Sequence, residues 1–347
     1  MGKSGIGTYI ENIVRELVLN HPEHSYLLVG GEDKLVQYEQ KGNVTVQYCN
    51  IKPFSIKELF RFPVSDINRC DAFFTPYINI PLGIRIPIYA TIHDVLFLDV
   101  VGLTSWSGRL IRRLYIGYAV QRAKSIFTVS EFSKSRILSH FRTKKKIAIT
   151  YNTISAVIKQ TQPNIYPKQN SIIYVGNIKP HKGLSVLLKA FIEARKEGLQ
   201  CNLLLVGERE KFRTVDDAVV NNWLNRDDVV FTGYVSTERL IQLIASSRVL
   251  VLPSYYEGFG IPPMEALYLG TNVIVSDIPV LKEIYHDLPV TYFKCGDVDD
   301  LKRKLLEINT TTVEEELTVY RNRKLIDSIY NPKQIANNLL ADIVAGF

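Results

Sequence analysis

Two glutamates around a glycine turn are the residues of this 347-residue chain whose types and spacing most clearly indicate chemistry. Glu257 and Glu265 stand eight positions apart, and Gly258, Phe259 and Gly260 follow the first of them. A carboxylate can accept paired hydrogen bonds from a diol, and glycine lets backbone amides approach a phosphate closely. The segment therefore predicts a site for a ligand that carries both sugar hydroxyls and phosphate.

The elements around this turn would hold the glutamates in place. The apolar run 249–252 predicts a buried parallel strand, and Pro262 with Pro263 is typical of the first turn of a helix. At such a junction, the free amides and the helix dipole attract a phosphate. Glu257 could then bind hexose hydroxyls and Glu265 a ribose diol. The alternative is a strand, a glycine turn and an acidic helix with no ligand.

This segment resembles the donor-binding signature of the retaining glycosyltransferases of family 4, in which two glutamates with seven residues between them bracket a Gly-Phe-Gly turn. The resemblance implies an α/β protein of the GT-B type, with two Rossmann-like doubly wound domains facing a cleft. It also implies a hexosyltransferase that takes a nucleotide diphosphate sugar as donor and needs no metal or other cofactor. In that family Glu257 would be catalytic, and residues 258–260 with Glu265 would bind the donor.

A basic loop in the second half of the chain matches a second part of the family pattern. The run Gly176–Gly183 follows an expected strand, and a lysine there can neutralise a departing diphosphate. Lys182 matches the catalytic lysine of the family, and Asn177, with a donor-binding role, stands near the place of the family's arginine. The arginine is absent, so Lys179 or His181 is expected to compensate. The alternative for Lys182 is an ordinary solvated lysine.

Two further residues are assigned roles by the resemblance. His93 ends the apolar strand expected at 86–92 and resembles the family histidine that touches the donor sugar. The alternative is a histidine satisfied by a local backbone bond. Val235, after the strand expected at 229–231, resembles the loop whose backbone holds the nucleotide base.

The N-terminal glycines resemble the phosphate loop of the first domain. Gly5 and Gly7 lie within the first residues of the chain, so the first, central strand of that domain is expected to be missing. A start codon placed too late would explain this, and a truncated natural product is the alternative. Further along, Ser130 is expected to cap a helix that begins at Glu131.

The order of apolar runs and amphipathic periods predicts two α/β domains. A chain that is 46% hydrophobic and 22% charged is typical of a globular protein of this length. The polar segment before residue 171 reads as a linker, and the last helix is expected to pack back on the first domain. The expected boundaries are 1–155 for the first domain, 156–170 for the linker, 171–330 for the nucleotide-sugar domain and 331–347 for the final helix.

Charge is distributed unevenly along the chain. Residues 1–150 hold 20 Lys and Arg against 12 Asp and Glu, a net charge of +8 within a total of +7. Such a basic half could bind nucleic acid, an anionic membrane surface or a diphosphate-linked acceptor. The sequence has no nucleic-acid motif, which favours the last two.

One basic amphipathic stretch, 106–122, predicts a helix that lies on a membrane surface. Residues 144–146 would add to that surface, and the alternative is a solvated face over a core. The residues expected to contact the membrane are Trp106, Arg109, Arg112 and Arg113.

The remaining expectations concern compartment and substrate. No apolar run reaches the roughly 18 residues of a membrane span, and the four cysteines are scattered, which predicts a cytoplasmic protein, at the inner face of the membrane if the basic helix docks there. The loop around Lys182 resembles that of bacterial mannosyltransferases of polysaccharide assembly, which favours GDP-mannose over UDP-sugars and dTDP-rhamnose, with a glycan or lipid-linked acceptor. The alternatives are a non-catalytic nucleotide-sugar-binding subunit and a sugar-nucleotide epimerase.

Overall fold

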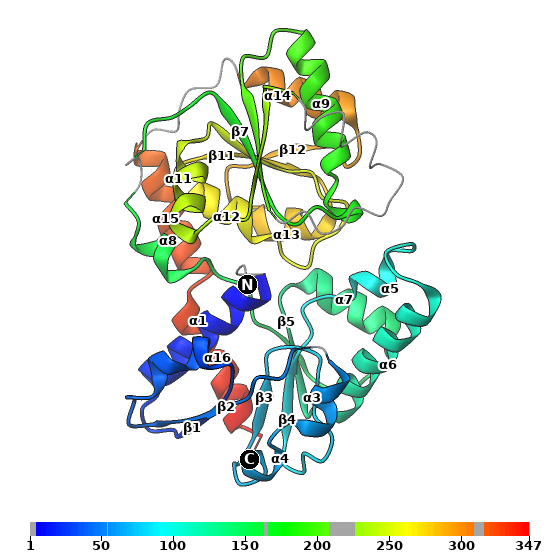
Figure 1. Cartoon of the computed structure of the whole chain (residues 1–347), viewed down its shortest axis with the longest axis vertical. Helices are drawn as coiled ribbons and strands as arrows, with labels where there is room; N and C mark the ends of the chain where they lie inside the picture. Colours follow the sequence, from blue (N-terminus) through cyan, green and yellow to red (C-terminus); the bar gives the residue numbers. More distant parts are fainter. Residues whose placement is uncertain (1–4, 54, 163–165, 208–225, 309–315, 347) are drawn as a thin grey trace. The chain divides into compact units, whose positions relative to one another are not determined.

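The computed structural model describes residues 5–53, 55–162, 166–207, 226–308 and 316–346 (Figure 1). The chain forms two compact units. The first unit contains residues 3–153 together with 330–347, and the second unit contains residues 154–329.

The second unit is built on a six-stranded parallel sheet in the order β12-β11-β10-β7-β8-β9. From the centre, the chain runs outward through β7, β8 and β9, and then returns to build β10, β11 and β12 on the other side. The topological switch point therefore lies between β7 and β10, where ligands of doubly wound folds bind. The strands are β7 Ser171–Val175, β8 Asn202–Val206, β9 Val229–Gly233, β10 Val249–Leu252, β11 Asn272–Ser276 and β12 Thr291–Phe293.

Helices cover both faces of this sheet because its strands are apolar on both sides. Alternate residues such as Ile172 and Val251 join the core under α9 and α14, while Leu250 and Val275 are buried on the opposite face. The helices of this unit are α8 Ala156–Gln160, α9 Leu184–Lys196, α11 Thr237–Ser246, α12 Ile261–Tyr268, α13 Pro279–Tyr285, α14 Val298–Glu307 and α15 Glu316–Ile329, with a 3₁₀ turn, η2, at Pro180–Lys182.

The first unit has two parallel sheets, β3-β4-β5-β6 and β1-β2. Its strands are β1 Tyr26–Gly30, β2 Val44–Tyr48, β3 Phe73–Thr75, β4 Ile88–Thr91, β5 Ser125–Thr128 and β6 Ile147–Ile149. Its helices are α1 Gly5–Asn20, α2 Glu32–Leu35, α3 Ile56–Arg61, α4 Val64–Ile67, α5 Leu96–Asp99, α6 Trp106–Arg122, α7 Glu131–His140 and α16 Pro332–Val344, with a 3₁₀ turn at Val36–Tyr38.

The N-terminal glycines do not form the loop that the sequence suggested. Gly5 and Gly7 lie in the first turn of α1, which buries Tyr9, Ile13 and Leu17 at helical spacing. The first described strand of the chain is β1, and among the described residues it pairs with β2 rather than with the four-stranded sheet.

The expected linker at 156–170 is part of the second unit. Ile154 and Ile158 are buried, and Lys168 Nζ donates to the carbonyl of Ser247 at 3.0 Å. These apolar and polar contacts fix the segment, so the unit begins at residue 154 rather than 171.

The final helix belongs to the first unit. α16 packs along α1, Tyr89 Oη donates to the carbonyl of Ile343 at 3.0 Å, and His21 Nε2 lies 2.8 Å from Asn337 Oδ1. A segment more than 300 residues from the N-terminus thus completes the first unit.

Two loops at the switch point of the second unit approach each other closely. Gly183, at the start of α9, has φ +67°, and a Cβ on it would lie 1.9 Å from the carbonyl oxygen of Pro253 after β10. The Tyr255 amide donates to the carbonyl of His181 at 2.8 Å. Only glycine permits this approach, so the backbone fixes the two loops against one another.

Gly183→Ala should therefore disrupt both loops. The variant should lose more stability than Gly198→Ala, because Gly198 also has positive φ but has open space around its Cβ position. Urea unfolding of both variants measures this difference. Equal stability of the two variants would contradict the proposed role of the close approach.

Candidate functional site

Glu257 lies at the centre of a polar cluster at the carboxyl ends of β7 and β10. Lys182 Nζ donates to its Oε1 at 2.7 Å and to its Oε2 at 2.8 Å. Ser254 Oγ also donates to Oε1 at 2.7 Å. The side chain of Glu257 is 9% exposed and that of Lys182 is 23% exposed. Lys182 and Glu257, which belong to two sequence motifs 75 residues apart, thus form one ion pair.

The glycine turn after Glu257 is held by a tyrosine. Gly260 has φ +87° and precedes α12, and a Cβ there would lie 2.8 Å from Leu281. Tyr285 Oη donates to the Gly260 carbonyl and lies 3.1 Å from the Met264 amide, which donates to it. Because Pro262 and Pro263 also fix the first turn of α12, the backbone at 258–260 is rigid.

Glu265 has a different environment from Glu257. It is half-buried on α12, and its carboxylate makes no hydrogen bond or ion pair with the residues that the structure describes. Burial raises its pKa to about 7. A carboxylate held in this way without a partner is available to a ligand that donates hydrogen bonds.

The loop that lacks the family's arginine contains two lysines, Lys179 and Lys182, and one histidine, His181. His181 is 7% exposed, and burial together with the nearby Lys182 lowers its pKa to about 4, so its ring is neutral near pH 7. The Asn177 carbonyl accepts from Tyr174 Oη at 3.1 Å. Lys182 supplies positive charge beside Glu257, and the expectation that Lys179 or His181 compensates for the arginine stays a prediction.

His93 and Ser130 belong to the first unit, and Val235 belongs to the second. His93 follows β4, and its Nε2 lies 2.9 Å from the Pro76 carbonyl, which is the local backbone bond considered above. Val235 lies between β9 and α11 of the second unit. Ser130 caps α7 as predicted, since its Oγ accepts from the Ser133 amide at 3.0 Å.

The arginines of α6 fold back onto the protein. Arg109 donates to the carbonyl of Leu98, Arg112 stacks 4.1 Å from the ring of Phe97, and Arg113 lies 5.5 Å from the ring of Phe141. Four large apolar side chains of α6 are exposed. They are Trp106, Leu110, Ile111 and Leu114, which are 79%, 41%, 53% and 63% exposed, and Arg113 and Arg122 of the same helix are exposed as well.

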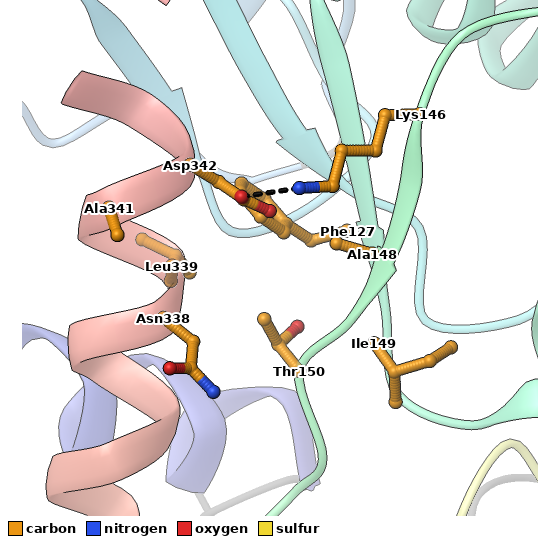
Figure 2. A pocket seen from close by; sticks show the side chains of 9 residues that line it. All are labelled: Phe127, Lys146, Ala148, Ile149, Thr150, Asn338, Leu339, Ala341 and Asp342. Carbon is orange, nitrogen blue, oxygen red and sulfur yellow. Dashed lines mark hydrogen bonds and ion pairs between the residues drawn. The ribbon is translucent and has the colours of Figure 1, made fainter. Parts of the chain in front are cut away.

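Two of the three lysines expected to extend that surface also have partners. Lys145 Nζ donates to the carbonyl of Ala123 at 2.6 Å. Lys146 pairs with Asp342 of α16 at 2.5 Å, across one end of a groove of about 320 Å³ between α16 and β6 (Figure 2). Phe127 and Leu339 line the groove between that ion pair and Thr150.

The described ranges contain neither a cluster of metal ligands nor a membrane-spanning helix. No three His, Cys, Asp or Glu side chains there lie together as a metal site would require. None of the helices in those ranges is both long and apolar enough to cross a membrane.

Comparison with protein families identifies the part of the chain that carries this site. The family described as "Glycosyl transferases group 1" matches residues 158–324. Residues 158–324 form a glycosyl transferases group 1 domain. This glycosyltransferase domain contains the paired Lys182 and Glu257 and the partnerless Glu265.

Curated relatives of the chain include bacterial mannosyltransferases. The O-antigen chain mannosyltransferase RfbU of Salmonella typhimurium is 31% identical over 235 residues, which are 66% of this chain and 63% of that protein. O-antigen chain mannosyltransferase B of Escherichia coli is 29% identical over 200 residues, 54% of this chain and 52% of that protein. The matched region thus spans less than two thirds of the length of either relative.

Solved structures share the GT-B fold. HepE of Anabaena, crystallised with UDP and glucose, has a TM-score of 0.74 at 16% identity, and the match covers 100% of this chain and 97% of HepE. The lipopolysaccharide outer core galactosyltransferase WaaB has a TM-score of 0.65 at 17% identity, with 100% and 97% of the two chains covered. The predicted fold class, two Rossmann-like units of the GT-B type, is confirmed at the level of fold.

Sequence reasoning missed two residues that support the site. Ser254 binds Glu257 directly, and its position three residues before the glutamate at a strand end could have indicated this. Tyr285 supports the glycine turn from 25 residues away, which no local pattern reveals.

The environment of Glu265 predicts a pH-dependent stability. Its pKa is about 7 in the folded protein against 4.5 in the unfolded chain, so ionisation destabilises the fold as pH rises from about 4.5 to about 7. Glu265→Gln should therefore unfold with the same free energy as wild type near pH 4.5 and be more stable by about 3 kcal/mol at pH 8.

Urea unfolding at both pH values measures this difference. Asp227→Asn, which removes an exposed carboxylate of the same unit, supplies the control. A Glu265→Gln variant with wild-type stability at pH 8 would show that the carboxylate has a partner in solution.

Proposed function

We propose that this chain is a retaining, metal-independent hexosyltransferase that transfers a sugar from a nucleotide diphosphate sugar to a glycan or lipid-linked acceptor in cell-surface polysaccharide synthesis. The observation that carries the proposal is the Lys182–Glu257 ion pair at the switch point, together with Glu265, whose carboxylate has no partner among the described residues. GDP-mannose is the favoured donor because several relatives are named as mannosyltransferases.

Each residue then has a role in binding or transfer. Lys182 meets the negative charge that develops on the departing diphosphate, together with amides of the rigid turn Gly258–Gly260. Glu257 orients the sugar hydroxyls and supports the positive charge at the anomeric carbon. Glu265 binds the ribose diol. His93 contacts the sugar.

The donor-free geometry implies an exchange of partners when the donor binds. Lys182 already neutralises Glu257, so a diphosphate must compete for the ammonium group. Once Lys182 turns to the diphosphate, the Glu257 oxygens are released to accept hydrogen bonds from sugar hydroxyls. Ser254 keeps one of these oxygens in place during the exchange.

The other predicted site residues also have roles in the proposal. Gly176, Asn177 and Val235 would contact the diphosphate or the base through their backbone, at the carboxyl ends of β7 and β9. Gly5 and Gly7, as part of the first turn of α1, would face a ligand only through the helix N-terminus rather than through a phosphate loop.

Transfer assays with GDP-mannose, UDP-glucose and dTDP-rhamnose test the proposal. We expect turnover with one donor and a product with the donor's anomeric configuration, read by proton NMR. Lys182→Ala should lower kcat by at least about 10²-fold because the leaving group loses its charge partner, whereas Lys189→Ala, an exposed lysine of α9, should not.

The products also separate the alternatives. Full activity of Lys182→Ala would refute the leaving-group role. Formation of an epimer would indicate an epimerase, and nucleotide binding without any product would indicate a non-catalytic subunit.

The exposed face of α6 supports a peripheral association with the cytoplasmic face of a membrane. Apolar side chains would enter the bilayer, and α6 contains four arginines and no acid, which favours anionic lipid headgroups. The prediction named Trp106, Arg109, Arg112 and Arg113, and the proposal now adds Leu110, Ile111 and Leu114 to Trp106 as the apolar contacts.

Vesicle sedimentation tests this association. Trp106→Ser combined with Leu114→Ser should weaken binding to vesicles that contain phosphatidylglycerol, because the inserted apolar area is lost. Val36→Ser, which changes another exposed apolar residue of the same unit, should leave binding unchanged. Equal binding by all three proteins would contradict the proposal.

A further inference from the structure

Glu58 is a buried acid of the first unit that none of the sequence motifs includes. It lies on α3 and is 3% exposed, although glutamate is almost never fully buried unless it has partners. Its Oε1 accepts from Tyr77 Oη, and its Oε2 accepts from Asn79 Nδ2 at 2.5 Å. Both partners belong to the loop that follows β3.

Thr75 also contacts the loop at residues 76–79. Thr75, at the end of β3, lies with its Oγ1 3.2 Å from the carbonyl of Tyr77 and 3.3 Å from that of Asn79. Asn79 is itself 2% exposed. The backbone of residues 76–79 is thus fixed between the strand end and the Glu58 carboxylate.

The loop presents one carbonyl to His93. The Pro76 oxygen lies 2.9 Å from His93 Nε2. A carbonyl can only accept, so Nε2 carries the hydrogen. Burial lowers the pKa of His93 to about 4, so the ring is neutral near pH 7 and its Nδ1 carries a lone pair.

A tyrosine fixes the plane of the same ring. Tyr9 meets His93 edge to face, with centroids 4.9 Å apart and planes at 86°. Its hydroxyl lies 3.2 Å from Thr91 Oγ1 and 2.9 Å from Thr150 Oγ1. Tyr9 therefore sets the ring plane, and the loop at 76–79 sets which nitrogen carries the hydrogen.

We propose that Glu58 is a positioning residue for His93: by holding Tyr77 and Asn79 it fixes the Pro76 carbonyl, which selects the Nε2–H tautomer and leaves Nδ1 as a hydrogen-bond acceptor. The Nδ1 atom then accepts a hydrogen bond from a hydroxyl group. It does not bind an unprotonated phosphate oxygen, because that oxygen and Nδ1 both carry lone pairs and neither has a hydrogen to donate. The contact with a substrate hydroxyl rests on the function proposed above, whereas the tautomer does not.

The tautomer can be read directly by long-range proton–nitrogen NMR of the full chain labelled with ¹⁵N-histidine, with His93→Gln to assign the signals. The wild type should show a protonated Nε2 and an unprotonated Nδ1 at His93, unchanged between pH 6 and pH 8. In Glu58→Ala the two nitrogens should move toward averaged shifts, because the Pro76 carbonyl is no longer held. Glu58→Gln, whose amide can still bind both partners, should restore the wild-type signals.

Asp99 supplies the matched control. Its side chain is an 8% exposed acid of the same unit that binds Arg136 and His140 and does not touch the 76–79 loop. Asp99→Ala should destabilise the protein and leave the His93 signals unchanged. If Glu58→Ala fails to fold, Tyr77→Phe removes one of the two contacts and should shift the signals in the same direction.

Kinetics separate this inference from the proposed function. Glu58→Ala should lower kcat by about tenfold or more while the dissociation constant of the nucleotide stays within twofold of wild type. Averaged His93 signals with undiminished kcat would support the positioning role and remove His93 from the proposed mechanism. Unchanged His93 signals in Glu58→Ala and Tyr77→Phe would overturn the inference.

Discussion

The ion pair between Lys182 and Glu257 is the interaction on which the candidate site depends. It joins the loops that follow two adjacent central strands, β7 and β10, at the point where the sheet order reverses. A half-buried pair of this kind adds little net stability, since desolvation offsets much of the attraction. A role of the ion pair in donor binding therefore explains it better than a role in stability. The diphosphate is the one group of such a donor that can compete with Glu257 for the ammonium group.

The two glutamates of the site differ because their surroundings differ. Glu257 is held by Lys182 and Ser254, whereas Glu265 lies on α12 without a described partner and has a raised pKa. Such a separation of environments is how a protein gives two identical side chains different tasks. In the proposed mechanism, Glu257 is preorganised around the reacting sugar and Glu265 binds the ribose diol.

Much of the fold follows from sequence patterns, because local apolar periodicity decides where strands and helices form. The runs 249–252 and 202–206 are the strands β10 and β8, and the stretch 237–246 is the helix α11. Tertiary partners were the part that could not be predicted. Lys146 binds Asp342, 196 residues away, and Arg109 and Arg112 of α6 contact the carbonyl of Leu98 and the ring of Phe97.

For the site residues, too, the local pattern could be predicted from the sequence and the tertiary partners could not. The spacing of Glu257 and Glu265 around a glycine turn indicated a ligand site, since strand, turn and helix are contiguous there. The pairing of Glu257 with Lys182 depends on which strands are neighbours in the sheet, and the sequence does not state that order. Glu58 could not be recognised at all, because its partners Tyr77 and Asn79 belong to a loop without regular structure.

Calorimetric titration of the 347-residue chain with GDP, UDP and dTDP tests the central claim most directly, namely that the loops after β7 and β10 bind a nucleotide diphosphate. The account predicts saturable binding of one of the three nucleotides at one site per chain, and loss of that binding in Glu265→Ala. Absence of binding to all three nucleotides, or equal binding by wild type and Glu265→Ala, would contradict it.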